Sequence, residues 1–154
     1  MTYFPDFAEY EYETPKPLRG VRTIGWLDAA HEFQKAHPSD EVLQRLQTVM
    51  SERVTSNIHA SLIRGTMPCP ICGVRDYPHP ELLVGSTEIW LPDNDGGYFA
   101  APSMIYHFIS AHNYAPPKEF LDALFGFEPA SNFRAQKISE DLMAEAMGFG
   151  ADID

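Results

Sequence analysis

The two cysteines of this 154-residue chain constrain its fold more than any other feature. Cys69 and Cys72 are the only cysteines, and they share a turn that reads Pro-Cys-Pro-Ile-Cys-Gly. Two histidines, His107 and His112, follow within one short apolar segment. Four soft or borderline ligands of this kind are what a closed tetrahedral zinc site requires. We therefore expect one Zn²⁺ to tie together two segments that are far apart in the sequence.

The spacing of the four ligands predicts a ββα-like zinc module: a cysteine knuckle, an enlarged β-hairpin and a helix. Thirty-four residues separate Cys72 from His107, and they contain the predicted hairpin. Gly73 closes the knuckle, where it can adopt the positive φ that such turns use. In a straight helix His107 and His112 point about 140° apart, because each residue turns the helix by about 100°. Both reach one ion only if the last helical turn loosens, which Asn113 favours.

Other interpretations of these residues stay open. A redox Cys-x-x-Cys pair normally precedes a helix whose N-terminus lowers the thiol pKa, and residues 73–78 are a poor helix start. The two histidines can also be ordinary half-buried residues without a metal. His79 is a rival ligand, because it follows Cys72 closely in a proline-flanked loop. Three further histidines have no spacing partner and are expected on the surface or in the core: His31, His37 and His59.

The completeness of the ligand set favours a structural ion over a catalytic one. A catalytic zinc keeps one coordination position open for water, and four protein ligands leave none. Glu88 lies in a predicted strand and would act as a general base if one ligand were absent. Such a residue is more often on the solvent side of a hairpin. A zinc-dependent hydrolase with an open metal position near Glu88 is therefore the alternative to a non-enzymatic protein.

Periodicity and turn signals predict an α+β fold. Apolar residues at helical spacing indicate an amphipathic helix over residues 39–53. A hairpin is predicted with strands at 82–91 and 98–100 around a turn at 92–97. Residues 54–67 are ambiguous between helix and strand. Three more helices are expected, one beginning at Pro102, one after residues 116–117 and one over residues 131–147.

We expect the whole chain, residues 1–154, to form a small single domain. Its parts are an extended aromatic and acidic arm (1–24), an N-terminal helical part (25–67), a zinc-tied knuckle, hairpin and helix (68–125), and a C-terminal helix with an acidic tail (126–154). The additional helices are expected to flank the zinc module.

Charge limits the kinds of partner that this chain can bind. It carries 11 Lys and Arg against 22 Asp and Glu, a formal net charge of −11, with acids gathered at both ends. Such a chain repels phosphate backbones, so we expect no nucleic-acid binding. A basic protein partner fits the charge better, with Trp90 and Tyr98 as exposed aromatic contacts. The start lacks the pattern of a signal peptide and no apolar run approaches about 20 residues, so we expect a cytoplasmic protein without membrane contact.

Several short motifs together resemble an uncharacterised bacterial family of small zinc-binding domains of unknown function. The resemblance covers residues 24–124 and is carried by Gly-Trp-Leu-Asp at 25–28, Cys-Pro-x-Cys at 69–72, Gly-Ser-x-Glu-Ile-Trp at 85–90, Ala-Pro at 101–102, Ile-Tyr-His-Phe at 105–108 and His-x-Tyr-x-Pro-Pro-x-x-Phe at 112–120. It implies metal ligation by the same two cysteines and two histidines, and brings no established activity. From size, acidity and the lack of catalytic motifs we expect a non-enzymatic protein that binds another protein, in the manner of an immunity or antitoxin-like inhibitor.

Overall fold

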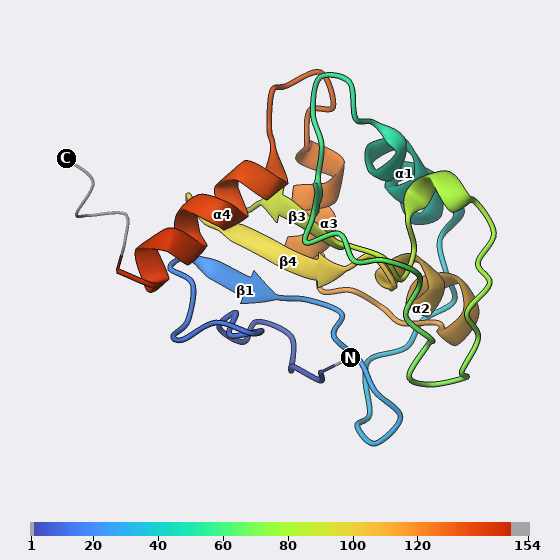
Figure 1. Ribbon diagram of the computed structural model, residues 1–154. Helices are drawn as coiled ribbons and strands as arrows, with labels where there is room; N and C mark the ends of the chain where they lie inside the picture. The colour runs from blue at the N-terminus through green and yellow to red at the C-terminus, as the bar shows by residue number, and fades with distance from the viewer. Residues whose placement is uncertain (1, 149–154) are drawn as a thin grey trace.

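A four-stranded mixed sheet forms the centre of the protein. The computed structural model describes residues 2–148, and Figure 1 shows the sheet between two layers of other structure. The strand order is β1-β4-β3-β2, with β1 parallel to β4 and the other neighbours antiparallel. The strands are β1 (Val21–Thr23), β2 (His59–Ala60), β3 (Glu88–Pro92) and β4 (Tyr98–Pro102). The predicted hairpin is thus the pair β3 and β4, in which Trp90 lies opposite Ala100.

Helices and sheet together confirm the predicted α+β class. The helices are α1 (Asp40–Ser51), the short 3₁₀ helix η1 (Pro80–Leu82), α2 (Ile105–His112), α3 (Lys118–Gly126) and α4 (Ala135–Ala146). One start was wrong: Pro102 does not begin a helix but ends β4, where it pairs with Glu88, and α2 begins at Ile105. Proline is tolerated at the end of a strand, so the residue type alone did not decide between the two roles. The ambiguous segment 54–67 contributes the short strand β2 and no helix.

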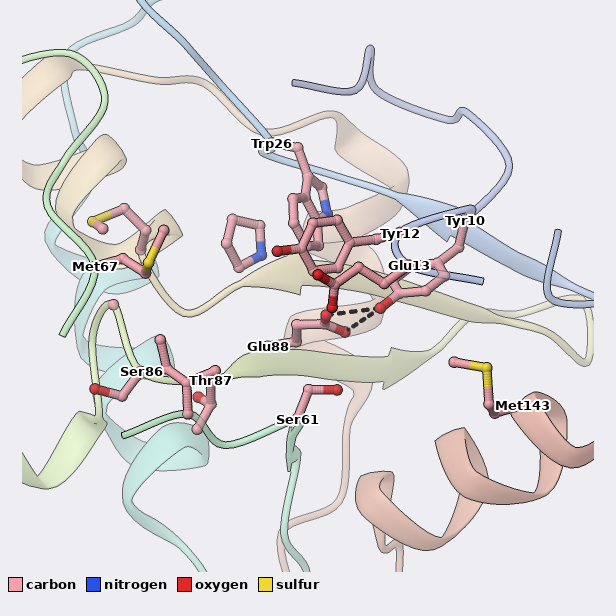
Figure 2. Close-up of a pocket in the computed structure, with 14 residues that line it drawn as sticks. Tyr10, Tyr12, Glu13, Trp26, Ser61, Met67, Ser86, Thr87, Glu88 and Met143 are labelled. Atoms are coloured by element: carbon pink, nitrogen blue, oxygen red, sulfur yellow. Dashed lines mark hydrogen bonds between the residues drawn. The ribbon is translucent and has the colours of Figure 1, made fainter. Parts of the chain in front are cut away.

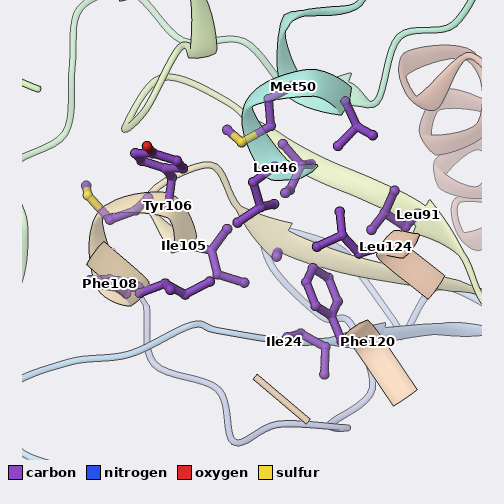
Figure 3. Packing of buried hydrophobic residues seen from close by; sticks show 14 of the residues in the cluster. Ile24, Leu46, Met50, Leu91, Ile105, Tyr106, Phe108, Phe120 and Leu124 are labelled. Atoms are coloured by element: carbon purple, nitrogen blue, oxygen red, sulfur yellow. The ribbon is translucent and has the colours of Figure 1, made fainter. Parts of the chain in front are cut away.

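One face of the sheet carries the larger core, against α1, α2 and α3. Alternate residues of the hairpin point to this side, with Ile89 and Leu91 from β3 and Phe99 and Ala101 from β4. Figure 3 shows the helices supplying the remainder from several directions; the labelled members are Ile24, Leu46, Met50, Leu91, Ile105, Tyr106, Phe108, Phe120 and Leu124. The helix predicted at 39–53 is amphipathic as expected, because its buried side chains recur at helical spacing.

The opposite face of the sheet is also covered. The N-terminal arm and α4 lie on it, and Tyr10, Trp26 and Leu142 pack there with Trp90. Trp90 is 0 % exposed, so its expected role as an exposed contact residue is wrong. Glu88 points to the same face and is 6 % exposed, so it is not on a solvent side. One face of a hairpin is exposed to solvent only when nothing packs on it, and here the arm and α4 cover that face.

Aromatic and polar contacts attach the arm to the sheet. Five aromatic side chains of the arm lie against rings of the domain: Tyr3 on His31, Phe4 on Trp26, Phe7 on Phe99, Tyr10 on Trp26 and Trp90, and Tyr12 on Trp26. Asp6 accepts hydrogen bonds from the backbone N–H of Gly25 at 2.9 Å and from the Tyr114 hydroxyl at 2.8 Å. The arm is therefore part of the fold.

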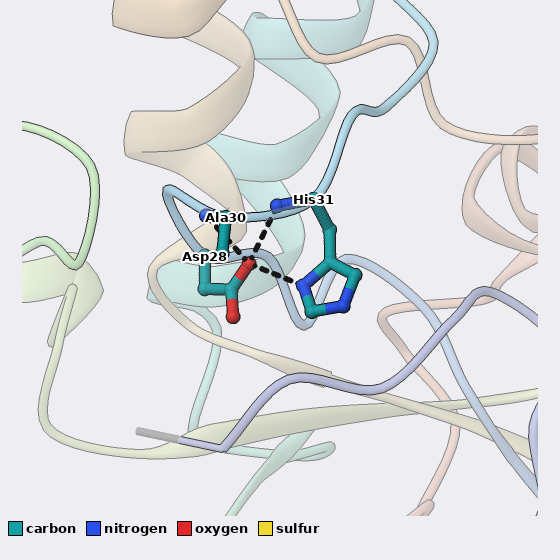
Figure 4. Close-up of polar contacts among 3 residues, drawn as sticks. All are labelled: Asp28, Ala30 and His31. Carbon is teal, nitrogen blue, oxygen red and sulfur yellow. Dashed lines mark hydrogen bonds and ion pairs between the residues drawn. The ribbon is translucent and has the colours of Figure 1, made fainter.

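The Gly-Trp-Leu-Asp motif at residues 25–28 builds the turn that leaves β1. The Trp26 indole N–H donates to the carbonyl of Ala100 at 2.9 Å. Asp28 Oδ1 accepts from the backbone N–H groups of Ala30 and His31 and lies 2.8 Å from His31 Nδ1, as Figure 4 shows. The hydrogen bond from His31 holds the pKa of the Asp28 carboxyl below its usual value. This motif thus has a structural explanation that needs no ligand.

The acidic tail falls partly outside the described residues. The predicted final helix is present as α4, whose acids Glu140, Asp141 and Glu145 are exposed. Asp152 and Asp154 lie outside residues 2–148. Within residues 2–148, no helix is both long and apolar enough to cross a membrane.

Candidate metal centre

The cysteine turn has the backbone geometry of a zinc knuckle. Gly73 N–H donates to the Cys69 carbonyl at 2.8 Å, and Cys69 N–H donates to the Val74 carbonyl at 2.9 Å. The backbone N–H of Ile71 points at Cys69 Sγ, at 3.4 Å. Gly73 has φ +79°, the left-handed conformation that its sequence position predicted. N–H groups directed at sulfur favour a thiolate, the form that binds a metal ion.

Both histidines come from α2, which ends immediately after the second. Asn113 follows in the left-handed region, with φ 59°, and donates its N–H to the Phe108 carbonyl five residues earlier. This bond spans one residue more than the hydrogen bonds of a regular helix. The wider last turn brings the rings of His107 and His112 to 5.0 Å between centroids. The end of the helix therefore supplies the loosening that a shared ion needs.

The knuckle and α2 bring the four predicted ligands together. Cys69 Sγ lies 3.5 Å from His112 Nε2, and Cys72 Sγ lies 3.5 Å from His107 Nε2. One donor atom from each of the four residues lies within 4.8 Å of the other three. Within residues 2–148 this group includes neither His79 nor Glu88. These four residues could hold one metal ion.

The donor set and its dimensions fit a tetrahedral Zn²⁺. With Zn–S bonds of about 2.3 Å and Zn–N bonds of about 2.0–2.1 Å, a tetrahedron has a sulfur-to-nitrogen edge of about 3.5 Å. The two measured edges have this length. Thiolate and imidazole together favour zinc over the hard cations Mg²⁺ and Ca²⁺, which prefer oxygen. The residues present therefore fit the ion that the sequence predicted.

Burial shifts the pKa of Cys69, His107 and His112 in the absence of an ion. Cys69 is buried, and desolvation raises the pKa of its thiol. Desolvation also lowers the pKa of His107, helped by its neighbour His112, and lowers that of His112 itself. Neutral imidazole is the form that binds metals, so the lowered pKa values suit ligation at neutral pH. A bound cation would reverse the effect on the thiol, since a coordinating thiol loses its proton.

Tyr77 supports the site from outside the ligand set. Its ring packs edge-on against His107, with centroids 5.1 Å apart. Its hydroxyl lies within hydrogen-bond distance of the carbonyls of Val74, at 2.9 Å, and Met67, at 3.0 Å. Burial, with the two cysteines nearby, raises the pKa of Tyr77 to about 12. Tyr77 thus joins the α2 side of the site to the backbone that precedes and follows the cysteines.

The other histidines lie elsewhere. His79 is exposed in the loop before η1, where it lies 3.5 Å from Glu81. His31 and His37 are exposed, and His59 is buried in β2. His59 Nε2 lies 2.7 Å from the Met50 carbonyl, which can only accept, so Nε2 carries the proton and Nδ1 accepts from Thr87 at 2.7 Å. Sequence reasoning left this core histidine without a partner because one partner is a backbone carbonyl nine residues earlier and the other, Thr87, follows 28 residues later, and neither spacing is a recognisable motif.

Glu88 belongs to a second site, which sequence reasoning missed. Its carboxylate accepts from the Tyr10 hydroxyl at 2.7 and 2.9 Å and from the Trp90 indole N–H at 3.0 Å. It lies at the wall of a cavity between the arm and the sheet (Figure 2). A signal was present: Glu88 is followed directly by Ile-Trp-Leu, and an unbroken apolar run indicates a strand buried on both faces. Tyr98, the other expected contact residue, is half-buried against Trp90 and Phe133.

Fold and site together define an α+β domain with a candidate Cys₂His₂ metal centre. Residues 2–125 match the family described as Domain of unknown function (DUF7919), and the chain belongs to that family. The match includes all four grouped ligands and begins earlier in the chain than the predicted resemblance did. A search of curated proteins and a search of solved structures found no match. The family therefore supports a domain of unknown function, and the site must be interpreted from its own geometry.

Proposed function

We propose that Cys69, Cys72, His107 and His112 bind one structural Zn²⁺. The observation that carries this proposal is the convergence of four donor atoms within 4.8 Å, with both sulfur-to-nitrogen edges at 3.5 Å. Four protein donors complete a tetrahedron, so the ion contributes folding free energy and leaves no position for substrate. The site joins the cysteine knuckle to the end of α2, and the β3–β4 hairpin lies between these two segments in the sequence.

Metal analysis of the purified protein tests this proposal. We expect one zinc per chain in the wild type and its loss in Cys69→Ser and in His107→Ala. His79→Ala is the matched control, since His79 is an exposed histidine in the neighbouring loop. Substitution by Co²⁺ gives a second readout, because thiolate ligation produces intense visible absorption. Zinc that survives in His107→Ala and disappears in His79→Ala would overturn the proposed ligand set.

At the level of the whole protein we propose a non-enzymatic cytoplasmic role in binding another, basic protein, as an immunity or antitoxin-like inhibitor of bacterial origin. The net charge of −11 supports this partner class and disfavours nucleic acid. A more specific support is an acidic depression of about 400 Å³ beside the β3–β4 turn. Its lining contains four acidic residues, Asp93, Asp95, Glu119 and Asp122, against one basic residue, Arg22, and includes the exposed ring of Phe7. This surface replaces the buried Trp90 as the proposed contact region.

Charge variants separate a specific surface from general acidity. The double variant Glu119→Gln and Asp122→Asn removes two charges from the depression, and Glu140→Gln with Asp141→Asn removes two from exposed positions of α4. We expect a basic partner captured by the wild type to be lost with the first variant and retained with the second, and binding to weaken as salt rises. Equal retention by both variants would contradict the proposed surface.

A zinc hydrolase that uses Glu88 as a base is the second candidate. It requires an open metal position next to Glu88, and Glu88 is instead hydrogen-bonded to Tyr10 and Trp90 in a separate cavity. A hydrolase screen on zinc-loaded protein, repeated with Glu88→Gln, tests it: activity that disappears in the variant would favour the enzyme.

A further inference from the structure

The cavity that contains Glu88 has an unusual lining for its size. It encloses about 320 Å³ between the N-terminal arm, the start of β3 and α4, which is within the range of small-molecule sites. Figure 2 shows Glu13, from the arm, and Glu88, from the start of β3, with their carboxylates toward each other and the rings of Tyr10, Tyr12 and Trp26 beside them. The apolar wall is formed mainly by Ile63, Met67, Met104 and Met143. Among the described residues that line it, none is Lys or Arg.

The carboxylate of Glu88 is held but not neutralised. Its hydrogen-bond donors are a phenol, from Tyr10, and an indole, from Trp90, and both are uncharged groups. Burial raises the pKa of Glu88, and the nearby carboxylate of Glu13 raises it further. A buried charge is costly unless it is paired with an opposite charge. The cavity therefore has room for a positively charged group, and its lining supplies none.

The aromatic rings form a corner next to this carboxylate. The ring centroids of Tyr12 and Trp26 are 5.2 Å apart, and those of Tyr10 and Trp26 are 6.2 Å apart with nearly perpendicular planes. Ring faces carry partial negative charge, so a cation placed in such a corner is attracted to several rings at once. The aromatic rings and the carboxylates thus both attract a cation.

We propose that this cavity binds an organic cation, an ammonium group that carries methyl or other apolar substituents. The positive charge would lie between Glu88 and the rings of Tyr12 and Trp26, and the substituents would contact the methionine wall. An anion would be repelled by both glutamates. A hard metal ion such as Ca²⁺ takes about six to eight oxygen ligands, whereas this lining offers two carboxylates and a few hydroxyls among rings and thioethers. The proposal is independent of the metal centre, whose ligand group does not include Glu88.

Calorimetry on the full-length, zinc-loaded protein tests the proposal with two probes. Choline is the charged probe, and its neutral isostere, in which carbon replaces the nitrogen, is the control of equal shape. We expect choline to bind about tenfold or more tightly than the isostere, because only the cation gains from the carboxylate and the ring faces. Equal affinities would overturn cation recognition, and the absence of binding by choline at millimolar concentration would overturn the site.

Charge-matched variants locate the binding. Glu88→Gln keeps the size and an acceptor for Tyr10 and Trp90 but removes the charge, and we expect it to weaken choline binding at least tenfold. Glu11→Gln makes the same change at an exposed position of the arm that does not line the cavity, and should leave affinity unchanged. Tyr12→Leu, at a half-buried position, removes one ring and should weaken choline without affecting the isostere. Choline binding that is unaffected by Glu88→Gln and Tyr12→Leu would place it elsewhere and overturn the proposal.

Discussion

The metal centre and the Glu88 cavity differ in how their polar side chains are partnered. At the metal centre, Cys69, Cys72, His107 and His112 point their donor atoms at one another, and few other groups engage them. In the cavity, Glu88 receives hydrogen bonds from Tyr10 and Trp90 and is satisfied in number of partners but not in charge. Mutual convergence of donors fits the binding of one metal ion. A carboxylate that is hydrogen-bonded but has no opposite charge beside it indicates a position where the fold tolerates the desolvation cost of a buried charge.

Zinc removal gives the largest expected effect and tests whether the two sites are independent. Chelation of the metal-loaded wild type should lower the melting temperature by about 10 °C or more, because ligand binding to the folded state is worth several kcal/mol. Differential scanning calorimetry measures the shift, with Cys69→Ser as the variant on which the chelator should have no effect. Glu88→Gln should show the same shift as the wild type. A much smaller shift in that variant would couple the sites and break the comparison.

Acid should act on His59, which lies beside Thr87 of the cavity wall. Burial lowers the pKa of His59 from 6.5 to about 4. As the pH falls, the unfolded state therefore binds the proton before the folded state does. The stabilising contribution of neutral His59 is fully present above pH 6.5 and is lost as the pH falls toward 4. The loss reaches about 3 kcal/mol, from about 1.4 kcal/mol per pKa unit.

Denaturant titrations of the wild type and His59→Gln across that range measure the effect. His59→Gln should be less stable at pH 7.5 and should show a shallower pH dependence, so that the two curves approach each other in acid. Release of zinc in acid affects both proteins alike and cancels in their difference. Parallel curves would show that His59 is not the responsible group.

Tyr10→Phe tests the hydrogen bond that holds the cavity's carboxylate. Loss of the donor at 2.7 Å from Glu88 should lower the free energy of unfolding by about 2 kcal/mol at pH 7, the usual value for hydrogen bonds to charged groups. Tyr12→Phe removes a hydroxyl at the rim of the same cavity and is the control. In a Glu88→Gln background the effect of Tyr10→Phe should halve. An unchanged effect there would mean that the charge of Glu88 contributes nothing.

Glu88→Gln alone should show the cost of that charge. Burial raises the pKa of Glu88, so its contribution to stability is present at low pH and is lost as the pH rises through the raised value. The variant should therefore gain stability relative to the wild type between acid and neutral pH. Thermal melts of both proteins at several pH values measure this, and a gain that is independent of pH would contradict it.

The smallest expected effect concerns the helix end that positions the metal ligands. Asn113 is in the left-handed conformation, so Asn113→Gly should be neutral or slightly stabilising and Asn113→Ala should cost about 1 kcal/mol. Both variants keep the four ligands. If the wide last turn positions His112, Asn113→Ala should also weaken Zn²⁺ binding in a competition titration. Equal zinc affinity in both variants would assign the turn to helix capping alone.

Local patterns predicted much of the fold. The helix at 39–53 and the hairpin across residues 92–97 followed from apolar spacing and turn residues, and both are present. The helix lies within two residues of its expected bounds, but the first hairpin strand begins at Glu88 instead of residue 82, because residue 82 ends the 3₁₀ helix η1 and a turn follows it. The helix was predicted correctly, but its start at Pro102 was wrong because proline also ends strands, and only the pairing of Pro102 with Glu88 decided between the roles. The exposure expected for Trp90 and Glu88 failed because the covering elements, the arm and α4, lie far away in the sequence.

By itself, the sequence determined the two halves of the metal-ligand set, a Cys-x-x-Cys turn closed by glycine and a histidine pair at the end of a helix, because each half depends on local spacing. It also determined the strong negative charge and the main helices, which depend on composition and short-range periodicity. Only the tertiary structure decided that β1 pairs in parallel with β4, that His59 is a core residue and that Glu88 faces a cavity. Most of these features, and the meeting of the cysteine turn with α2, depend on contacts between residues far apart in the chain. Tyr10 and Glu88 are 78 residues apart and Cys69 and His112 are 43 apart, and no local spacing encodes such contacts.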